Sequence, residues 1–252
     1  MRWRSRFWTW ICACLCGGLL AVGTAVVPAV SQIDSATILA TIGDAVFVED
    51  DRATTRDTAE FGEEIRTENA LAEVEFNNAA IGRMGEYARA IVGQCVEVEN
   101  GQLLVSGPVN GCLSGFEAQV QGTIYLIDTT GDRGELKVLE GEVLLVPVPG
   151  EDDIEIENIP DPVLFRSGEK IFFPGRLQID RPRFLSGREF SDILTGNLFR
   201  EFDRPLPGQD SLPQVCRRLF PRYPCPERDR DGGFVRPKQP GPNLPPRRPR
   251  SR

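Results

Sequence analysis

The chain has 252 residues, of which 26% are charged, and a formal net charge of −8 at pH 7. This acidity disfavours nucleic acid and anionic membranes as partners of the main body. The chain contains no histidine, which excludes a Ser-His-Asp triad, a Cys-His pair and a histidine-bound zinc site. Its length suits one sizeable domain, or one domain with appendages.

Residues 1–31 have the order of a secretory signal peptide: a cationic end, an uncharged apolar run and a small-residue exit. The three parts are Arg2, Arg4 and Arg6, then Phe7 to Val27, then Ala29-Val30-Ser31. The run could also span a bilayer, so an uncleaved N-terminal anchor is the alternative. Cleavage would remove three arginines and no acid, which brings the net charge to −11. We therefore expect a periplasmic or secreted protein that touches the membrane only through an uncleaved signal.

The cysteines form two groups. Three lie inside the apolar run without a good lipobox before them, and we interpret them as small apolar residues: Cys12, Cys14 and Cys16. Four remain in the exported chain, where an even number indicates disulfides: Cys95, Cys112, Cys216 and Cys225. Three pairings are possible. The local ones, Cys95–Cys112 and Cys216–Cys225, are favoured over a metal site because the spacing is not C-x-x-C.

The middle of the chain, residues 38–148, alternates apolar and polar side chains with the period of a half-buried strand. In Ala70–Asn77 one predicted face is apolar, whereas Glu73 and Glu75 lie on the opposite, solvent-facing one. Val120–Ile127 alternates in the same way. Further short strands are predicted at Ile42–Val48, Ala80–Met84, Ala90–Val92, Val96–Val98, Gln102–Val105, Leu136–Leu139 and Val143–Val146.

Tight-turn dipeptides separate these strands, at Asn100-Gly101, Asn110-Gly111 and Gly131-Asp132. Many short strands with closely spaced turns predict an all-β fold of stacked short strands, either a β-solenoid or a sandwich. A short echo between residues 99–105 and 139–145, with a looser copy at 166–172, suits stacked coils or is a coincidence.

Residues 149–202 are predicted to form an extension. The acidic, proline-bearing stretch from Pro147 to Pro162 indicates an exposed connection with one edge strand at Ile154–Ile156, and Ile171–Ile179 adds further strand. A capping box begins at Ser186 and predicts one helix, which caps an end of the β core or binds a partner. Its apolar face comprises Phe190, Ile193, Leu194, Leu198 and Phe202, with Leu185 as a hydrophobic staple on Phe190.

Residues 203–252 hold twelve of the twenty prolines, and the stretch from Gly232 has no acid. This composition predicts a mostly disordered, polyproline-leaning basic tail. Its cations could touch anionic envelope polymers or lipid head groups, or it could be a solvated spacer. The basic residues are Arg236, Lys238, Arg247, Arg248, Arg250 and Arg252.

Five segments, taken in chain order, resemble a FecR domain over residues 38–148. They are Ile42-Gly43-Asp44-Ala45-Val46, Phe61 to Thr67, Ala72 to Phe76 with Ile81 to Met84, Val120 to Leu126, and Val138 to Val143. The motif positions are Gly62, Thr67, Gly122, Thr123, Glu140 and Gly141. The three glycines fall at strand starts or turns, where a missing Cβ permits positive φ. The resemblance implies an all-β periplasmic module.

In the regulator branch of that family, the domain senses an outer-membrane transporter and signals to a cytoplasmic sigma factor. That branch has a cytoplasmic segment before its membrane helix, whereas six residues precede the apolar run here. Direct control of a sigma factor is therefore not expected. The partner implied is an envelope protein, such as an outer-membrane transporter, or a cell-wall polymer.

Three functional hypotheses follow. The leading one is an exported module without cofactor or metal that binds or senses an envelope partner. The alternatives are a structural protein that binds peptidoglycan or polysaccharide, and a carboxylate-based glycan hydrolase using acids such as Glu73 and Glu75. Tryptophan occurs only at positions 3, 8 and 10, which weighs against sugar stacking. A calcium loop at Glu227–Gly232 has Lys238 where a bidentate Glu is required.

Overall fold

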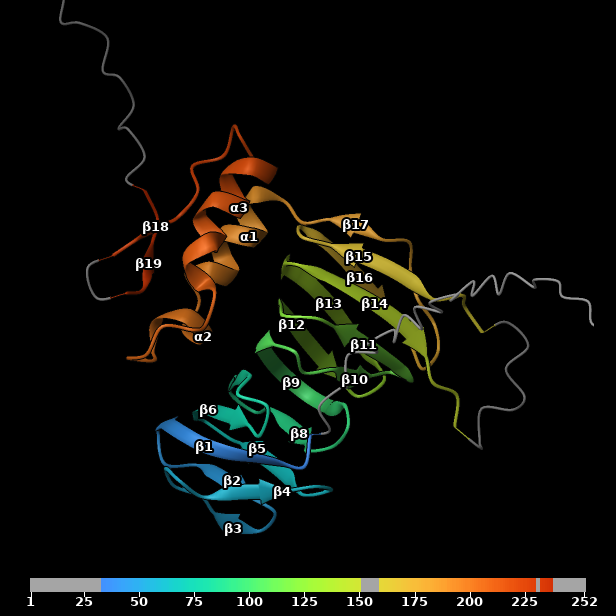
Figure 1. Cartoon of the computed structure of the whole chain (residues 1–252), viewed down its shortest axis with the longest axis vertical. Helices are drawn as coiled ribbons and strands as arrows, with labels where there is room; N and C mark the ends of the chain where they lie inside the picture. Colours follow the sequence, from blue (N-terminus) through green and yellow to red (C-terminus); the bar gives the residue numbers. More distant parts are fainter. Residues whose placement is uncertain (1–32, 151–158, 230–231, 238–252) are drawn as a thin grey trace, which may run out of the picture. The chain divides into compact units, whose positions relative to one another are not determined.

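The computed structural model describes residues 33–150, 159–229 and 232–237. The predicted signal (1–31), the predicted edge strand Ile154–Ile156 and the basic stretch 238–252 lie outside the described residues. No helix in the described part of the chain is long and apolar enough to cross a membrane. The fold is all-β with a helical extension, which confirms the predicted fold class (Figure 1).

The first half of the described chain consists of short strands. They are β1 (Ser35–Ile42), β2 (Val46–Val48), β3 (Asp51–Arg52), β4 (Thr58–Glu60), β5 (Glu64–Thr67), β6 (Leu71–Phe76), β7 (Ile81–Met84) and β8 (Arg89–Ile91). The long strand β9 (Val96–Gly107) follows. After it come β10 (Gly111–Leu113), β11 (Phe116–Val120), β12 (Thr123–Thr130), β13 (Arg133–Glu140), β14 (Glu142–Pro147), β15 (Val163–Arg166), β16 (Glu169–Phe173) and β17 (Arg183–Phe184).

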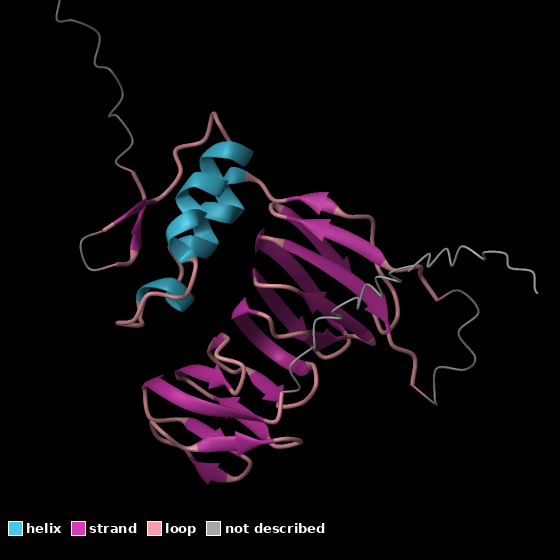
Figure 2. Ribbon diagram, viewed as in Figure 1, coloured by secondary structure: helices cyan, strands magenta, loops and turns pink. Residues whose placement is uncertain are grey.

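Backbone hydrogen bonds arrange these strands in two rows that share β9 (Figure 2). The first row runs β4-β1-β6-β7-β9-β12-β13-β16-β17. The second row runs β3-β2-β5-β8-β9-β10-β11-β14-β15. All neighbours are antiparallel except β9 and β10. The arrangement is a sandwich, which decides between the two architectures that the sequence left open.

Strand β9 belongs to both rows. Its first half pairs with β8 in the second row, and its second half pairs with β7 in the first row. Gly101 has φ 77°, and a Cβ there would lie 2.5 Å from the Cα of Ala88. Only glycine fits this close approach. The predicted turn at Asn100-Gly101 is therefore wrong, since one strand runs through it.

The main core lies between the two rows. Apolar side chains of both rows form one buried cluster, including Ile38 and Val74 from the first row and Val46 and Ile65 from the second. The predicted inward face of Ala70, Ala72, Val74 and Phe76 is buried throughout, with at most 3% exposure. Burial of the predicted inward face is confirmed, and burying such side chains drives the two rows together.

A second core covers the outer face of the first row. The extension contributes α1 (Gly187–Leu194), α2 (Asn197–Arg200), the 3₁₀ turn η2 (Gln209–Ser211), α3 (Leu212–Leu219) and the hairpin of β18 (Glu227–Arg228) with β19 (Phe234–Val235). Its apolar side chains, such as Phe190, Leu194 and Phe199, pack with Leu104 and Leu126 of the sheet. The predicted helix thus caps the β core, and its apolar face is not available to a partner.

The predicted capping box is present. Ser186 Oγ accepts a hydrogen bond from the Glu189 amide at 3.2 Å, and the Ser186 amide donates to Glu189 Oε2 at 2.8 Å. The single predicted helix is interrupted, because α1 ends at Leu194 and α2 begins after Gly196, which is its N-cap. Glycine weakens a helix interior, which accounts for the break at Gly196.

The prediction of a mostly disordered tail from residue 203 is wrong for its described part, residues 203–229 and 232–237. Leu212 and Val215 of α3 pack in the second core, as does Phe234 of β19. Pro213 lies in the first turn of α3, where its missing N–H is not required. The high proline content therefore predicted disorder for residues that in fact fold by packing on the sheet.

Candidate binding groove

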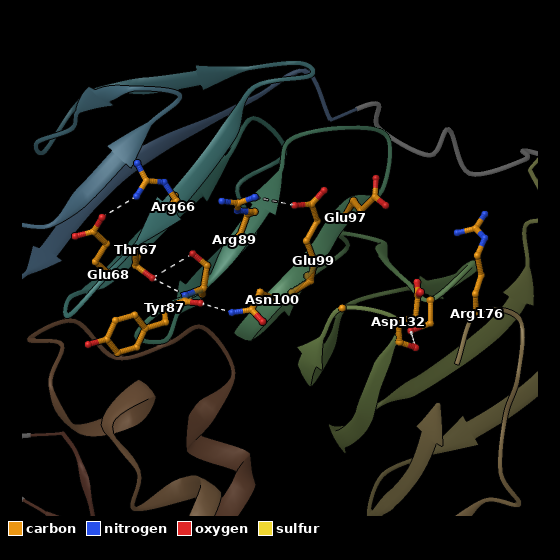
Figure 3. Close-up of a pocket in the computed structure, with 14 residues that line it drawn as sticks. Arg66, Thr67, Glu68, Tyr87, Arg89, Glu97, Glu99, Asn100, Asp132 and Arg176 are labelled. Carbon is orange, nitrogen blue, oxygen red and sulfur yellow. Dashed lines mark hydrogen bonds and ion pairs between the residues drawn. The ribbon is translucent and has the colours of Figure 1, made fainter. Parts of the chain in front are cut away.

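A cavity of about 660 Å³ opens across β5, β8 and the first half of β9, and extends to the turns after β10 and β12 (Figure 3). Most of its lining side chains are charged or polar. Arg66 of β5 and Arg89 of β8 are direct partners in the register, as are Arg89 and Asn100 of β9. The strand pairing therefore places these three side chains in one row across the floor, which we call the arginine row.

Nearby carboxylates neutralise part of the positive charge of the arginine row. Like charges directly opposite each other destabilise a strand pair, but Glu64 lies 3.6 Å from Arg66 and 3.2 Å from Arg89. Glu68 pairs with Arg66 at 2.8 Å, and Glu99 with Arg89 at 3.6 Å. The guanidinium of Arg66 also lies 4.4 Å from the centre of the Phe47 ring. These contacts hold the row in place while leaving its N–H groups at the surface.

Tyr87 projects from one wall on a constrained backbone. Its φ is 55°, an uncommon left-handed value for a residue with a bulky side chain. Its amide donates to the Glu68 carbonyl at 2.8 Å, and its carbonyl accepts from Asn100 Nδ2 at 2.7 Å. Its side chain is one of the exposed large apolar groups, with the residue 60% exposed. The fold thus fixes the backbone of Tyr87 and leaves its ring exposed at the groove.

Thr67 is a motif residue that lines this groove. Its Oγ1 donates to the Gly85 carbonyl at 2.6 Å and accepts from the Ala88 amide at 2.9 Å. The hydroxyl is therefore committed to holding the turn that carries Tyr87, and it is not available as a nucleophile.

The other end of the groove is built from turns. Ser114 Oγ donates to the Asp132 carbonyl at 2.9 Å, and the Leu177 amide donates to the Ser114 carbonyl at 2.8 Å. These bonds join the β10–β11 turn, the β12–β13 turn and the segment that carries Arg176. Asp132 and Arg176 both line this end of the cavity and are labelled in Figure 3. The groove therefore offers both signs of charge along its length.

The groove presents charged and hydrogen-bonding side chains. The described groups with a clearly shifted pKa lie elsewhere and have structural causes. Burial raises the pKa of Tyr125 and lowers that of Arg83. A hydrogen bond with Glu189 raises the pKa of Lys170. Groups that recognise polar ligands by charge and hydrogen bonding are present in the groove, and its described part holds no nucleophile paired with a base.

Four of the six motif residues meet elsewhere, at the junctions β11–β12 and β13–β14. Gly122 has φ 70° and Gly141 has φ 92°. Thr123 Oγ1 donates to the Glu142 carbonyl at 2.8 Å. A Cβ on Gly141 would lie 2.8 Å from Thr123 Oγ1. Glu140 accepts a hydrogen bond from Ser211 Oγ. These residues hold the strand junctions and contact the extension. Gly62, with φ 88°, forms the turn between β4 and β5.

The predicted solvent position of Glu73 is wrong. Glu73 is only 2% exposed, and its Oε2 accepts from Arg83 Nε at 2.7 Å. Arg83, which is fully buried, also donates to the Leu198 carbonyl at 2.8 Å and to the Arg204 carbonyl, and it lies 4.6 Å from the Phe202 ring centre. The extension covers this part of the sheet, so the pair is structural, whereas Glu75 is exposed.

Both disulfides have the local pairing that the sequence favoured. Cys95 is bonded to Cys112 and Cys216 to Cys225, with Cα–Cα distances of 5.5 and 5.9 Å. The first links the start of β9 to β10, next to the groove. The second links α3 to the segment before β18. Such bonds suit an oxidising compartment.

Part of the predicted calcium loop forms a strand of the β18–β19 hairpin. Glu227 and Arg228 form β18, and Arg228 pairs with Asp210. Asp231 and Lys238 lie outside the described residues. In the part of the chain that the structure covers, no group of three or more Cys, Asp or Glu residues is placed to hold a metal ion.

Comparisons with known proteins assign no family. No family model matches the chain, and no curated protein matches it. Two crystal structures of proposed anti-sigma factors from Parabacteroides distasonis ATCC 8503, at 1.65 and 2.50 Å resolution, are similar to 53% of this chain at 13% identity, with TM-scores of 0.42 and 0.41. The chain covers 65% and 64% of those proteins, less than two thirds of their length. A likeness at this level gives this chain neither an activity nor a partner.

Sequence reasoning missed the arginine row and Tyr87. Their residues come from three separate segments, and only the register between β5, β8 and β9 brings them together. One weak signal existed, since Tyr87 is one of three tyrosines and the sequence places it in a polar turn. Nothing local distinguishes Arg66 or Arg89 from ordinary surface charges.

Proposed function

We propose that this chain is a non-catalytic, exported FecR-like module that binds an envelope partner through the groove. The observation that supports this proposal best is the arginine row together with the exposed ring of Tyr87 in the same groove. Arginine and tyrosine are enriched at binding surfaces because they combine large contact area with hydrogen bonding at modest cost in conformational entropy. The two disulfides and the signal-like residues 1–31 support export.

The charges of the groove favour a polar, extended ligand. Arg66 and Arg89 retain donors beyond their ion pairs, because a guanidinium carries five N–H groups. Glu97 is exposed on β9 and has no ion pair with a described residue. A segment of an envelope protein with alternating charge would meet complementary groups along the floor. The net acidity of the chain would increase the rate of encounter with a basic partner.

Site-specific photocrosslinking in the native envelope tests this proposal. A photoreactive phenylalanine analogue at position 87 should yield a discrete crosslinked product. The matched control carries the same analogue at position 184, because Phe184 is 75% exposed and lies on β17, outside the groove. Capture of an outer-membrane transporter would indicate a sensor, and capture of peptidoglycan would indicate a wall-binding role.

The double variant R66A/R89A should reduce the product at position 87 by about tenfold, since loss of two charged hydrogen-bonding groups costs at least 1.4 kcal/mol. Equal products at positions 87 and 184, or a product unaffected by R66A/R89A, would contradict binding in the groove.

A further inference from the structure

A second cavity, of about 470 Å³, lies in the extension between α1 and the chain on either side of the β18–β19 hairpin. We call it the extension cavity. Its lining is Arg188 and Ser191 of α1, Tyr223 and Pro224 before the hairpin, and Arg236 and Pro237 after it. Its volume lies within the range of small-molecule sites, and it shares no lining residue with the groove.

Ser191 is the unusual member of this lining. The residue is 1% exposed, and its hydroxyl is the only buried side-chain polar atom of the described residues that has no hydrogen-bond partner. A buried serine in a helix commonly donates to a carbonyl in the preceding turn, but this one does not. Buried polar atoms without partners are rare in proteins, and a ligand is one explanation for them.

Two guanidinium groups face the same cavity. Arg188 is exposed and has no ion pair with any described residue. Arg236 pairs with Asp192, which leaves further N–H donors on its guanidinium. The lining therefore combines donors and positive charge, whereas none of its six residues is acidic.

The walls of the extension cavity are held in place. The ring of Tyr223 packs directly on Gly187, where a Cβ would lie 2.5 Å from the Tyr223 Cγ. Tyr223 is two residues from Cys225, which is bonded to Cys216 of α3. The two prolines add apolar surface with little conformational freedom. A rigid wall of this kind reduces the entropy lost when a ligand binds.

We propose that the extension cavity binds the phosphate group of a small sugar or polyol phosphate. The planar guanidinium fork matches phosphate oxygens. Ser191 Oγ, which is closed to solvent in this structure, would supply its unused hydrogen bond once the side chain rotates toward the cavity. The space beyond suits a polyol body against the proline walls. A free sugar phosphate and a phosphate in an envelope polymer present the same chemistry. This inference does not depend on the groove or on its partner.

Isothermal titration calorimetry on the full chain tests the proposal with four probes: glucose 1-phosphate, glucose, inorganic phosphate and a glycerol phosphate oligomer. We expect glucose 1-phosphate to bind at least about tenfold more tightly than inorganic phosphate, and glucose not to bind. Tighter binding of the oligomer would identify a polymer as the source of the phosphate, and tighter binding of glucose 1-phosphate would identify a free metabolite.

Three variants complete the test. R188A should weaken binding of the preferred phosphate by about tenfold or more. S191A should weaken it about threefold or more while leaving the melting temperature unchanged or higher, because it removes a buried group without a partner. The control R218A removes an exposed arginine of α3 outside the cavity and should leave binding unchanged. Equal affinities in R188A and R218A, or no binding of either organic phosphate, would overturn the proposal.

Discussion

At the scale of single residues, Arg83 has a large expected effect on stability. Its fully buried guanidinium bonds Glu73 in the sheet and two carbonyls of the extension. Replacing it with methionine would leave the Glu73 carboxylate buried without its cation. We expect R83M to lower the free energy of unfolding by about 3–5 kcal/mol, measured by urea denaturation.

The double variant R83M/E73L should recover part of that loss, because it removes the unpaired charge as well as its partner. The control R133M removes an exposed arginine at the start of β13 and should change stability by no more than about 0.5 kcal/mol. A loss in R83M that is no larger than in R133M would show that the buried pair does not hold the extension.

Glu189 links stability to pH. Burial alone would raise its pKa, but hydrogen bonds from Lys170 and Ser186 outweigh that effect and lower the pKa from 4.5 to about 2. Because the pKa of Glu189 is lower in the folded state than in the unfolded state, its ionised carboxylate stabilises the folded protein at pH values above about 4.5. This stability is lost as the pH falls from about 4.5 to about 2. The carboxylate is partly exposed, which reduces the effect to about 1 kcal/mol at pH 7.

E189Q should therefore be less stable than the wild type at pH 7, and the difference should disappear as the pH approaches 2, as followed by thermal denaturation between pH 2 and 7. The control E201Q changes an exposed acid after α2 and should show no such trend. A stability difference for E189Q that stays constant with pH would contradict this role of the carboxylate.

At the scale of elements, the extension covers an apolar face of the sheet. Phe199 of α2 is 2% exposed and lies 5.6 Å from the Phe234 ring of β19. We expect F199A to lower the free energy of unfolding by about 3–5 kcal/mol because it leaves a cavity in the second core. The control F184A, at the exposed Phe184 of β17, should cost about 0.5 kcal/mol or less in the same denaturation experiment.

The extension also explains which predictions from sequence succeeded and which failed. Period-two alternation located the inward face of β6 because that face meets the main core. In β12 the predicted apolar residues Ile124 and Leu126 face the second core, and Tyr125, predicted to lie opposite them, is buried in the main core. Alternation could not show that the opposite face is also covered, since the covering residues lie more than one hundred positions away, as Arg83 and Leu198 do. Glu73 was placed in solvent for this reason.

At the scale of the whole molecule, the local disulfides and the capping box were predictable because their partners are close in sequence. The path of β9 was not, because an Asn-Gly pair also occurs in ordinary hairpin turns. The groove was not predictable either, since it depends on the register of β5, β8 and β9. Structure was therefore needed wherever the property depended on distant pairing.

The sandwich and the extension share an apolar core, so we expect them to fold as one unit. Hydrogen–deuterium exchange of the intact protein tests it most directly. We predict that amides of α1 and α3 are protected to the same degree as those of β7 and β12, because the elements share one core. Exchange of residues 187–219 at the rate of an unfolded peptide, beside a protected sheet, would contradict the account.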